Sequence, residues 1–143
     1  MAKKTTKAML TAQDVYNAFN SKNIDRFASL LADDYVFEGD GSLRVDGAGF
    51  LEFIREYWKT YPDAKITATR TITQGNLAVG EGIFTGTHKG DFMGVPGTGK
   101  RVSFPFAEIF EFKGSKVKSM RVYNDTVSIV RQLGVVPIGF LTG

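Results

Sequence analysis

Apolar residues in the first sixty positions of the chain recur every three or four residues, the spacing that forms one face of a helix. This pattern predicts three helices, at residues 11–20, 24–34 and 49–61. Thr11 and Asp14 are spaced as in a capping box at the start of the first helix. Pro62 lies just beyond the end of the third, where a helix cannot easily continue.

Beyond residue 62 the apolar positions alternate with polar ones, and β-branched and aromatic residues become frequent, as in strands. The pattern predicts four strands, at residues 65–73, 77–90, 100–112 and 116–125, besides a short one at 35–38. A short final helix runs through Ile129 and Leu133 and is closed by Gly134. Helices followed by hairpin-connected strands predict an α+β fold with helices covering one side of a curved sheet.

The segment GVPGTGKR, residues 94–101, resembles a phosphate-binding loop. Arg101 occupies the position of the hydroxyl residue that would hold magnesium. A phosphate loop also needs a helix that begins beside it, because the helix amides bind the phosphates. No helical pattern follows Gly99, so we interpret the segment as a hairpin loop between two strands.

The composition narrows the class of protein. A chain of 143 residues with 43% hydrophobic content is sufficient for one domain. We expect residues 1–9 to be a disordered extension and residues 10–143 to form a single domain. The apolar C-terminal segment, residues 135–143, is expected to dock on the body or on a second subunit.

The charges and reactive residues exclude several kinds of partner. The formal net charge is +3, and three lysines in the first seven residues account for it. The body is therefore nearly neutral, which argues against a nucleic-acid surface. No apolar run is long enough for a signal peptide or a membrane span, so we expect a cytoplasmic protein. With no cysteine and one histidine, we expect no metal site built on sulfur or histidine ligands.

Two segments carry a more specific signal: GTHKGDFMGVPGTGKRV at 86–102 and KVKSMRVYNDTVSIVRQLG at 116–134. Their order and spacing resemble the SnoaL-like polyketide cyclase family, which belongs to the nuclear transport factor 2-like fold group. The matching residues are Gly86, Thr87, His88, Gly90, Asp91, Phe92, Thr98, Gly99, Lys100, Asp125, Gln132, Leu133 and Gly134. The resemblance implies N-terminal helices packed on a strongly curved, mostly antiparallel sheet that forms a conical barrel with an internal pocket. It also implies a homodimer.

The chain departs from the family pattern at a few positions. Gly97 replaces a usual proline in the loop, and Met120 and Arg121 replace a His-Trp pair. Glu81 occupies a position where arginine is frequent in the family. If both sites face the cavity, Glu81 and Arg121 form an exchanged ion pair.

Cyclases of this family close rings by intramolecular aldol chemistry without a metal or cofactor. Such a reaction needs a base for a proton beside a carbonyl and a donor to the carbonyl oxygen, and one carboxyl in an apolar pocket can provide both. The resemblance therefore implies cofactor-free cyclisation or isomerisation of a small, largely apolar carbonyl compound. The alternative is a non-catalytic protein of the same fold that binds a lipid-like or aromatic molecule.

Two residues of the matching segments are candidate catalytic residues. Asp125 is the acid or base that the resemblance implies, although its position also suits the N-cap of the last helix. His88 either donates to a developing oxyanion or orients the aspartate, or else it holds the hairpin by bonding to the loop backbone.

A second group of residues is expected to contact the substrate. Glu108 lies between Phe106 and Phe110 on an aromatic strand face, where a carboxyl must either pair with a cation or take up a proton. Arg121 on the adjacent strand is its expected partner. The full set of expected substrate contacts is Tyr16, Trp58, Phe106, Glu108, Arg121 and Tyr123.

Overall fold

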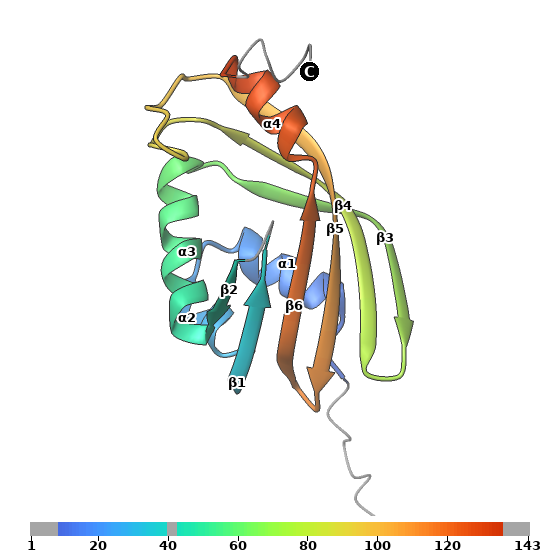
Figure 1. Cartoon of the computed structure of the whole chain (residues 1–143). Helices are drawn as coiled ribbons and strands as arrows, with labels where there is room; N and C mark the ends of the chain where they lie inside the picture. The colour runs from blue at the N-terminus through green and yellow to red at the C-terminus, as the bar shows by residue number, and fades with distance from the viewer. Residues whose placement is uncertain (1–8, 40–42, 136–143) are drawn as a thin grey trace, which may run out of the picture.

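The computed structural model describes residues 9–39 and 43–135 (Figure 1). The elements are α1 (Ala12–Asn20), α2 (Ile24–Ala28), β1 (Leu31–Glu38), β2 (Arg44–Asp46), α3 (Gly47–Thr60), β3 (Lys65–Gln74), β4 (Leu77–Thr87), β5 (Arg101–Lys113), β6 (Lys116–Asn124) and α4 (Thr126–Leu133). The expected N-terminal extension, apart from its last residue, and the C-terminal segment after residue 135 lie outside the described residues. Among the described helices, none has the length and apolar character needed to cross a membrane.

The first and third predicted helices are confirmed, and both begin at side-chain caps. The Thr11 hydroxyl accepts from the Asp14 amide at 3.2 Å, and the Asp14 carboxylate accepts from the Thr11 amide at 2.8 Å. Asp46 caps α3 by accepting from the Gly49 amide at 2.9 Å. These caps satisfy amides that the helices leave without a partner.

The second predicted helix is only partly right. α2 ends at Ala28, and the chain from Leu31 onward is strand β1, which lies parallel to β6. Leu31 pairs with Val117 and Phe37 with Met120. Pairing with a strand far away in the sequence therefore overrides the helical spacing of this segment.

The six strands form one sheet in the order β2-β1-β6-β5-β4-β3. All neighbours are antiparallel except β1 and β6. The sheet bends around the helices, but β2 and β3 remain its two edges (Figure 1). The predicted α+β fold with a curved, mostly antiparallel sheet is thus confirmed, and the cone is open along one side instead of closing as a barrel.

Alternation along β4 and β5 separates an inner face from an outer face. The inner face carries aromatic side chains that pack against α1 and α3. The outer face carries a cross-strand row of exposed apolar residues, Ile72, Val79 and Ile109. The homodimer stays a prediction, and this row is the place on the sheet where a second copy would bury apolar surface.

The connection between β4 and β5 is a hairpin loop, as interpreted from the sequence. The His88 amide donates to the Lys100 carbonyl at 2.9 Å, and the Gly99 amide donates to the His88 carbonyl at 2.8 Å. β5 begins at Arg101 directly after this pair, so no helix follows Gly99. The amide cradle of a phosphate loop is absent from this segment.

Candidate functional site

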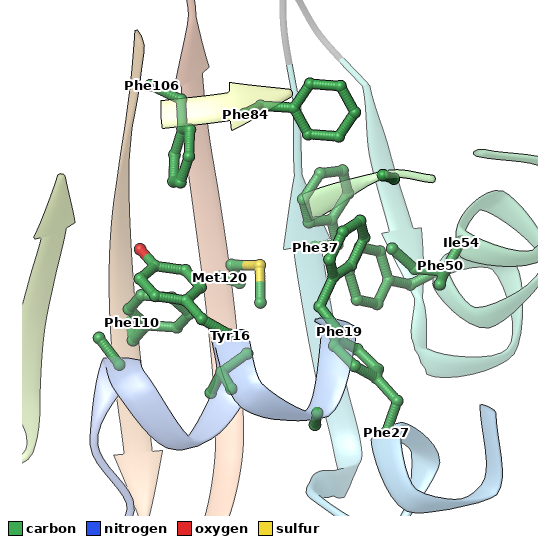
Figure 2. Packing of buried hydrophobic residues seen from close by; sticks show 14 of the residues in the cluster. Tyr16, Phe19, Phe27, Phe37, Phe50, Ile54, Phe84, Phe106, Phe110 and Met120 are labelled. Carbon is green, nitrogen blue, oxygen red and sulfur yellow. The ribbon is translucent and has the colours of Figure 1, made fainter. Parts of the chain in front are cut away.

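A cavity of about 380 Å³ lies between the inner face of the sheet and helices α1 and α3. Its walls are mostly aromatic, and Figure 2 shows several of these side chains facing one another across the interior. The phenylalanines among the lining residues include Phe19, Phe37, Phe50, Phe84, Phe104 and Phe106. Apolar walls with a few polar groups are typical of a site for a small, largely apolar molecule.

The mouth of the cavity is marked by lining residues that are themselves exposed. Leu43 precedes β2, Phe53 lies on α3, and Met93, which is 76% exposed, lies in the β4–β5 loop. These three side chains come from separate parts of the chain, and all three line the cavity. A ligand is therefore expected to pass near Leu43, α3 and the β4–β5 loop.

Glu108 is a buried carboxyl on the cavity wall. It lies on the inner face of β5 and is only 9% exposed. Burial raises its pKa to about 8, and the nearby Tyr16 hydroxyl lowers that pKa in part. Tyr16 and Glu108 face each other without a hydrogen bond of regular geometry, so we regard burial as the dominant cause. Near pH 7 the Glu108 carboxyl is therefore mostly protonated.

The predicted ion pair between Glu108 and Arg121 is wrong. Arg121 pairs in register with Ile109, the neighbour of Glu108, and so projects from the opposite face of the sheet. There its guanidinium binds the Glu38 carboxylate. The proposed exchange between Arg121 and Glu81 is wrong as well, since Glu81 lies 3.7 Å from Arg70. A shift of one residue along a strand moves a side chain to the other face, which decides the case of Glu108 and Arg121. Glu81 and Arg121 both lie on the outer face, away from the cavity.

Tyr16 reaches the cavity from α1 and lies directly over Gly80 of β4. A Cβ at Gly80 would lie 2.0 Å from Tyr16 Oη, so the space for this hydroxyl exists because residue 80 has no side chain. Gly80 pairs in register with Glu108, which brings the hydroxyl beside the carboxyl. Burial, and secondarily the charge of Glu108, raises the pKa of Tyr16, which keeps its hydroxyl protonated.

Gly80→Ala is expected to destabilise the fold by about 1–3 kcal/mol, because the added methyl group overlaps Tyr16. Tyr16→Phe in the same chain removes the contact at 2.0 Å but leaves one at 2.9 Å to the ring, so it should restore part of the loss. Gly47→Ala is the control, since its Cβ meets no atom closer than 3.9 Å. Urea denaturation measures the stability of Gly80→Ala, Tyr16→Phe, the double variant and Gly47→Ala. If the losses of the two single variants simply add in the double variant, the contact is contradicted.

The other expected substrate contacts divide into two groups. Phe106 lines the cavity. Trp58 does not, because its ring packs behind the wall against Phe19 with centroids 5.7 Å apart. Tyr123, at 53% exposed, projects from the outer face of β6, as Arg121 does. We therefore leave Trp58, Arg121 and Tyr123 out of the proposed site.

Sequence reasoning did not single out Asn124, which also lines the cavity from β6. It pairs in register with Phe106, two positions from Glu108 on the same inner face of β5. The strand alternation that placed Glu108 inward would have placed Asn124 inward too, once the pairing register of β5 and β6 was known.

Asp125 lies at the N-cap of α4. Its Oδ1 accepts from the Ser128 amide at 3.0 Å, and its side chain is exposed. Its neighbours Asn124 and Thr126 line the cavity, but Asp125 itself is not part of the lining. These contacts are those of the capping alternative, and a catalytic role of Asp125 stays a prediction.

Asp125→Asn is expected to keep both the fold and any catalysis, since asparagine caps helices as well as aspartate. Asp125→Ala should cost about 1 kcal/mol of stability, because the Ser128 amide loses its acceptor. Thermal unfolding and an activity assay on both variants check this pair of expectations. Loss of activity in Asp125→Asn at unchanged stability would instead show that Asp125 acts as the acid or base that the resemblance implies.

His88 is fully buried in the β4–β5 loop and does not line the cavity. Its Nδ1 accepts from the Thr98 amide at 3.1 Å and lies 3.0 Å from the Thr98 hydroxyl. Since an amide can only donate, Nδ1 is the acceptor and the ring proton lies on Nε2. The contacts of His88 thus fasten one side of the loop to the other, as in the structural alternative.

The class of protein defined by this geometry is an α+β cone around an apolar cavity with a buried carboxyl on its wall. The sequence pattern of the SnoaL-like polyketide cyclase family matches residues 10–133, and the chain belongs to that family. No curated protein matches the chain in sequence.

Several solved structures share the fold. IdmH of Streptomyces antibioticus, assigned as a polyketide cyclase, is 26% identical with a TM-score of 0.76, over 86% of this chain and 95% of its own. A Pseudomonas putida protein assigned as a polyketide cyclase is 21% identical with a TM-score of 0.80, and the match covers 88% of this chain and 98% of that protein. AclR of Streptomyces galilaeus, assigned as a hydroxylase, is 23% identical with a TM-score of 0.79, and the match covers 87% of this chain and 79% of AclR. The last assignment illustrates that this fold does not by itself fix the reaction.

Proposed function

We propose that the protein performs cofactor-free acid–base chemistry on a small, largely apolar carbonyl compound, with Glu108 as the proton-transferring group. The observation that supports this most is the place of Glu108: a carboxyl on the wall of an apolar cavity, with its pKa raised by burial to about 8. A group whose pKa lies near the working pH exchanges protons most effectively, because both of its forms are available. The family of the chain agrees with this chemistry.

In the proposed reaction the Glu108 carboxylate removes a proton from the carbon beside the substrate carbonyl. The electron pair of that C–H bond forms an enolate, and Glu108 becomes the carboxylic acid. In an isomerisation, Glu108 returns the same proton to another carbon of the enolate. In a cyclisation, the enolate carbon attacks a second carbonyl of the substrate, and the resulting alkoxide takes the proton from Glu108. Either sequence restores the carboxylate without a metal or redox partner.

Tyr16 has the properties of a hydrogen-bond donor in this reaction. Its hydroxyl stays protonated and lies beside the Glu108 carboxyl. No described residue accepts a hydrogen bond of regular geometry from it. A substrate oxygen in the cavity would give Tyr16 a partner and would gain stabilisation as it becomes negative.

A non-catalytic binding protein is the second candidate. The observation in its favour is that Asp125 and His88, the two residues expected to be catalytic, both lie outside the cavity lining. In this case Glu108 and Tyr16 would only orient a bound carbonyl compound.

Deuterium exchange into 2-tetralone, a small bicyclic ketone with acidic carbon-bound protons, separates the two candidates. We expect the protein to accelerate exchange in deuterium oxide over buffer, as followed by proton NMR. Binding of 2-tetralone, measured by calorimetry, without any acceleration of exchange would support the binding protein and contradict the acid–base proposal.

A further inference from the structure

The cavity wall holds a further polar side chain, Asn124, at a fixed place relative to Glu108. Residues Phe106 and Asn124 are directly paired across β5 and β6, and Glu108 is paired with Val122. Glu108 and Asn124 are therefore diagonal neighbours on one face, with backbones about 7 Å apart. Side chains of this length, projecting from the same face, can contact one ligand atom or two adjacent ones.

The surroundings of Asn124 leave its amide available to a ligand. It lines the cavity, and its direct cross-strand neighbour Phe106 has no polar atom in its side chain. Among residues 9–39 and 43–135, no group hydrogen-bonds to the side-chain amide of Asn124. A polar side chain beside apolar walls gains most from a ligand that satisfies it.

The charges of the wall favour one kind of ligand. Within the described part of the chain, no lysine, arginine or histidine is among the lining residues. An anionic ligand would thus enter without a compensating cation, which is costly in an apolar site. A neutral ligand whose oxygen becomes negative only during the reaction would instead use uncharged donors.

We propose that Asn124 is a ligand-binding residue whose amide donates a hydrogen bond to the carbonyl oxygen of a neutral substrate, next to Glu108 on the same wall. The inference rests on the proposed function for the identity of the oxygen, but not on Glu108 being catalytic. In the proposed reaction, Asn124 donates to the substrate oxygen while Glu108 exchanges protons with the adjacent carbon. Asn124 therefore stabilises the enolate and fixes which substrate carbon faces Glu108.

The probe for this inference is 2-naphthol, a flat molecule whose absorption spectrum reports whether its oxygen is protonated. The experiment uses the Glu108→Gln chain, so that no carboxyl of the wall titrates together with the probe. We expect the pKa of bound 2-naphthol to rise by about one unit, a tenfold weaker ionisation, when Asn124→Leu is added. Asn124→Asp, which keeps the shape of the side chain, should raise it further, because a carboxylate repels the naphtholate.

The inference is supported if the pKa of bound 2-naphthol rises from the chain with Asn at position 124, to that with Leu, to that with Asp. A merely structural role of Asn124 would not produce this order. An equal pKa in all three chains, or no spectrum of a bound form at saturating 2-naphthol, overturns it. Failure of 2-tetralone exchange together with the expected order would contradict only the acid–base proposal. Exchange by the natural chain with an equal pKa in the three variants would contradict only the role of Asn124.

Discussion

Glu108→Gln is expected to lower the rate of deuterium exchange into 2-tetralone by about 10²–10⁴-fold, the usual contribution of a general acid or base. Glutamine keeps the shape of the side chain and its hydrogen bonding, but it cannot carry the proton. Affinity for 2-tetralone should change much less, because the aromatic walls that bind the ketone stay in place. Proton NMR gives the exchange rate, and calorimetry gives the affinity.

The matched control for this prediction is Glu111→Gln on the same strand. Glu111 projects from the outer face, where it lies 3.6 Å from Lys118, and its replacement should leave exchange unchanged. Equal exchange rates for Glu108→Gln and the natural chain would show that another group moves the proton. Asp125 would then be the next candidate.

The second large effect concerns stability against pH. The ordinary pKa of a glutamate is 4.5, and that of Glu108 in the folded chain is about 8. The folded chain therefore holds this proton after the unfolded chain has lost it. The contribution of Glu108 to stability is complete below about pH 4.5 and is lost as the pH rises through about 8.

Between about pH 6 and pH 9, the natural chain should lose about 3 kcal/mol of unfolding free energy relative to Glu108→Gln, at 1.36 kcal/mol for each pK unit. The comparison removes the effects of all other titrating groups, because both chains share them. Urea denaturation at a series of pH values measures the difference. A constant difference across this range would mean that Glu108 titrates near its ordinary pKa, and that burial does not perturb it.

The strands that carry the site could be predicted from alternation alone. β4 and β5 follow the expected ranges closely, and their regular alternation correctly places Phe106, Glu108 and Phe110 on one buried face. Local caps likewise predicted α1, because Thr11 and Asp14 bond within a single turn. These features depend on residues near one another in the sequence, which is why the pattern reveals them.

The sequence-based predictions that were wrong concern features that depend on pairing between distant segments of the chain. β1 could not be distinguished from a helix before its parallel pairing with β6 was known. The partner of Arg121 depends on the register of β5 against β6, which alternation within one strand does not fix. The contact between Tyr16 and Gly80 joins a helix to a strand over sixty positions away, and no local pattern signals it. Asn124 was missed for the same reason as Arg121 was misplaced.

We expect Glu108 to be a protonated carboxyl on the cavity wall at neutral pH, and the proposed function depends on this state. Carbon-13 NMR of the chain with labelled glutamate carboxyls tests it directly, with the Glu108 resonance identified by its absence from Glu108→Gln. We predict a titration midpoint of about 8 for this resonance. A midpoint near the ordinary value of 4.5 would contradict the account, because the wall would then hold a carboxylate throughout the neutral range.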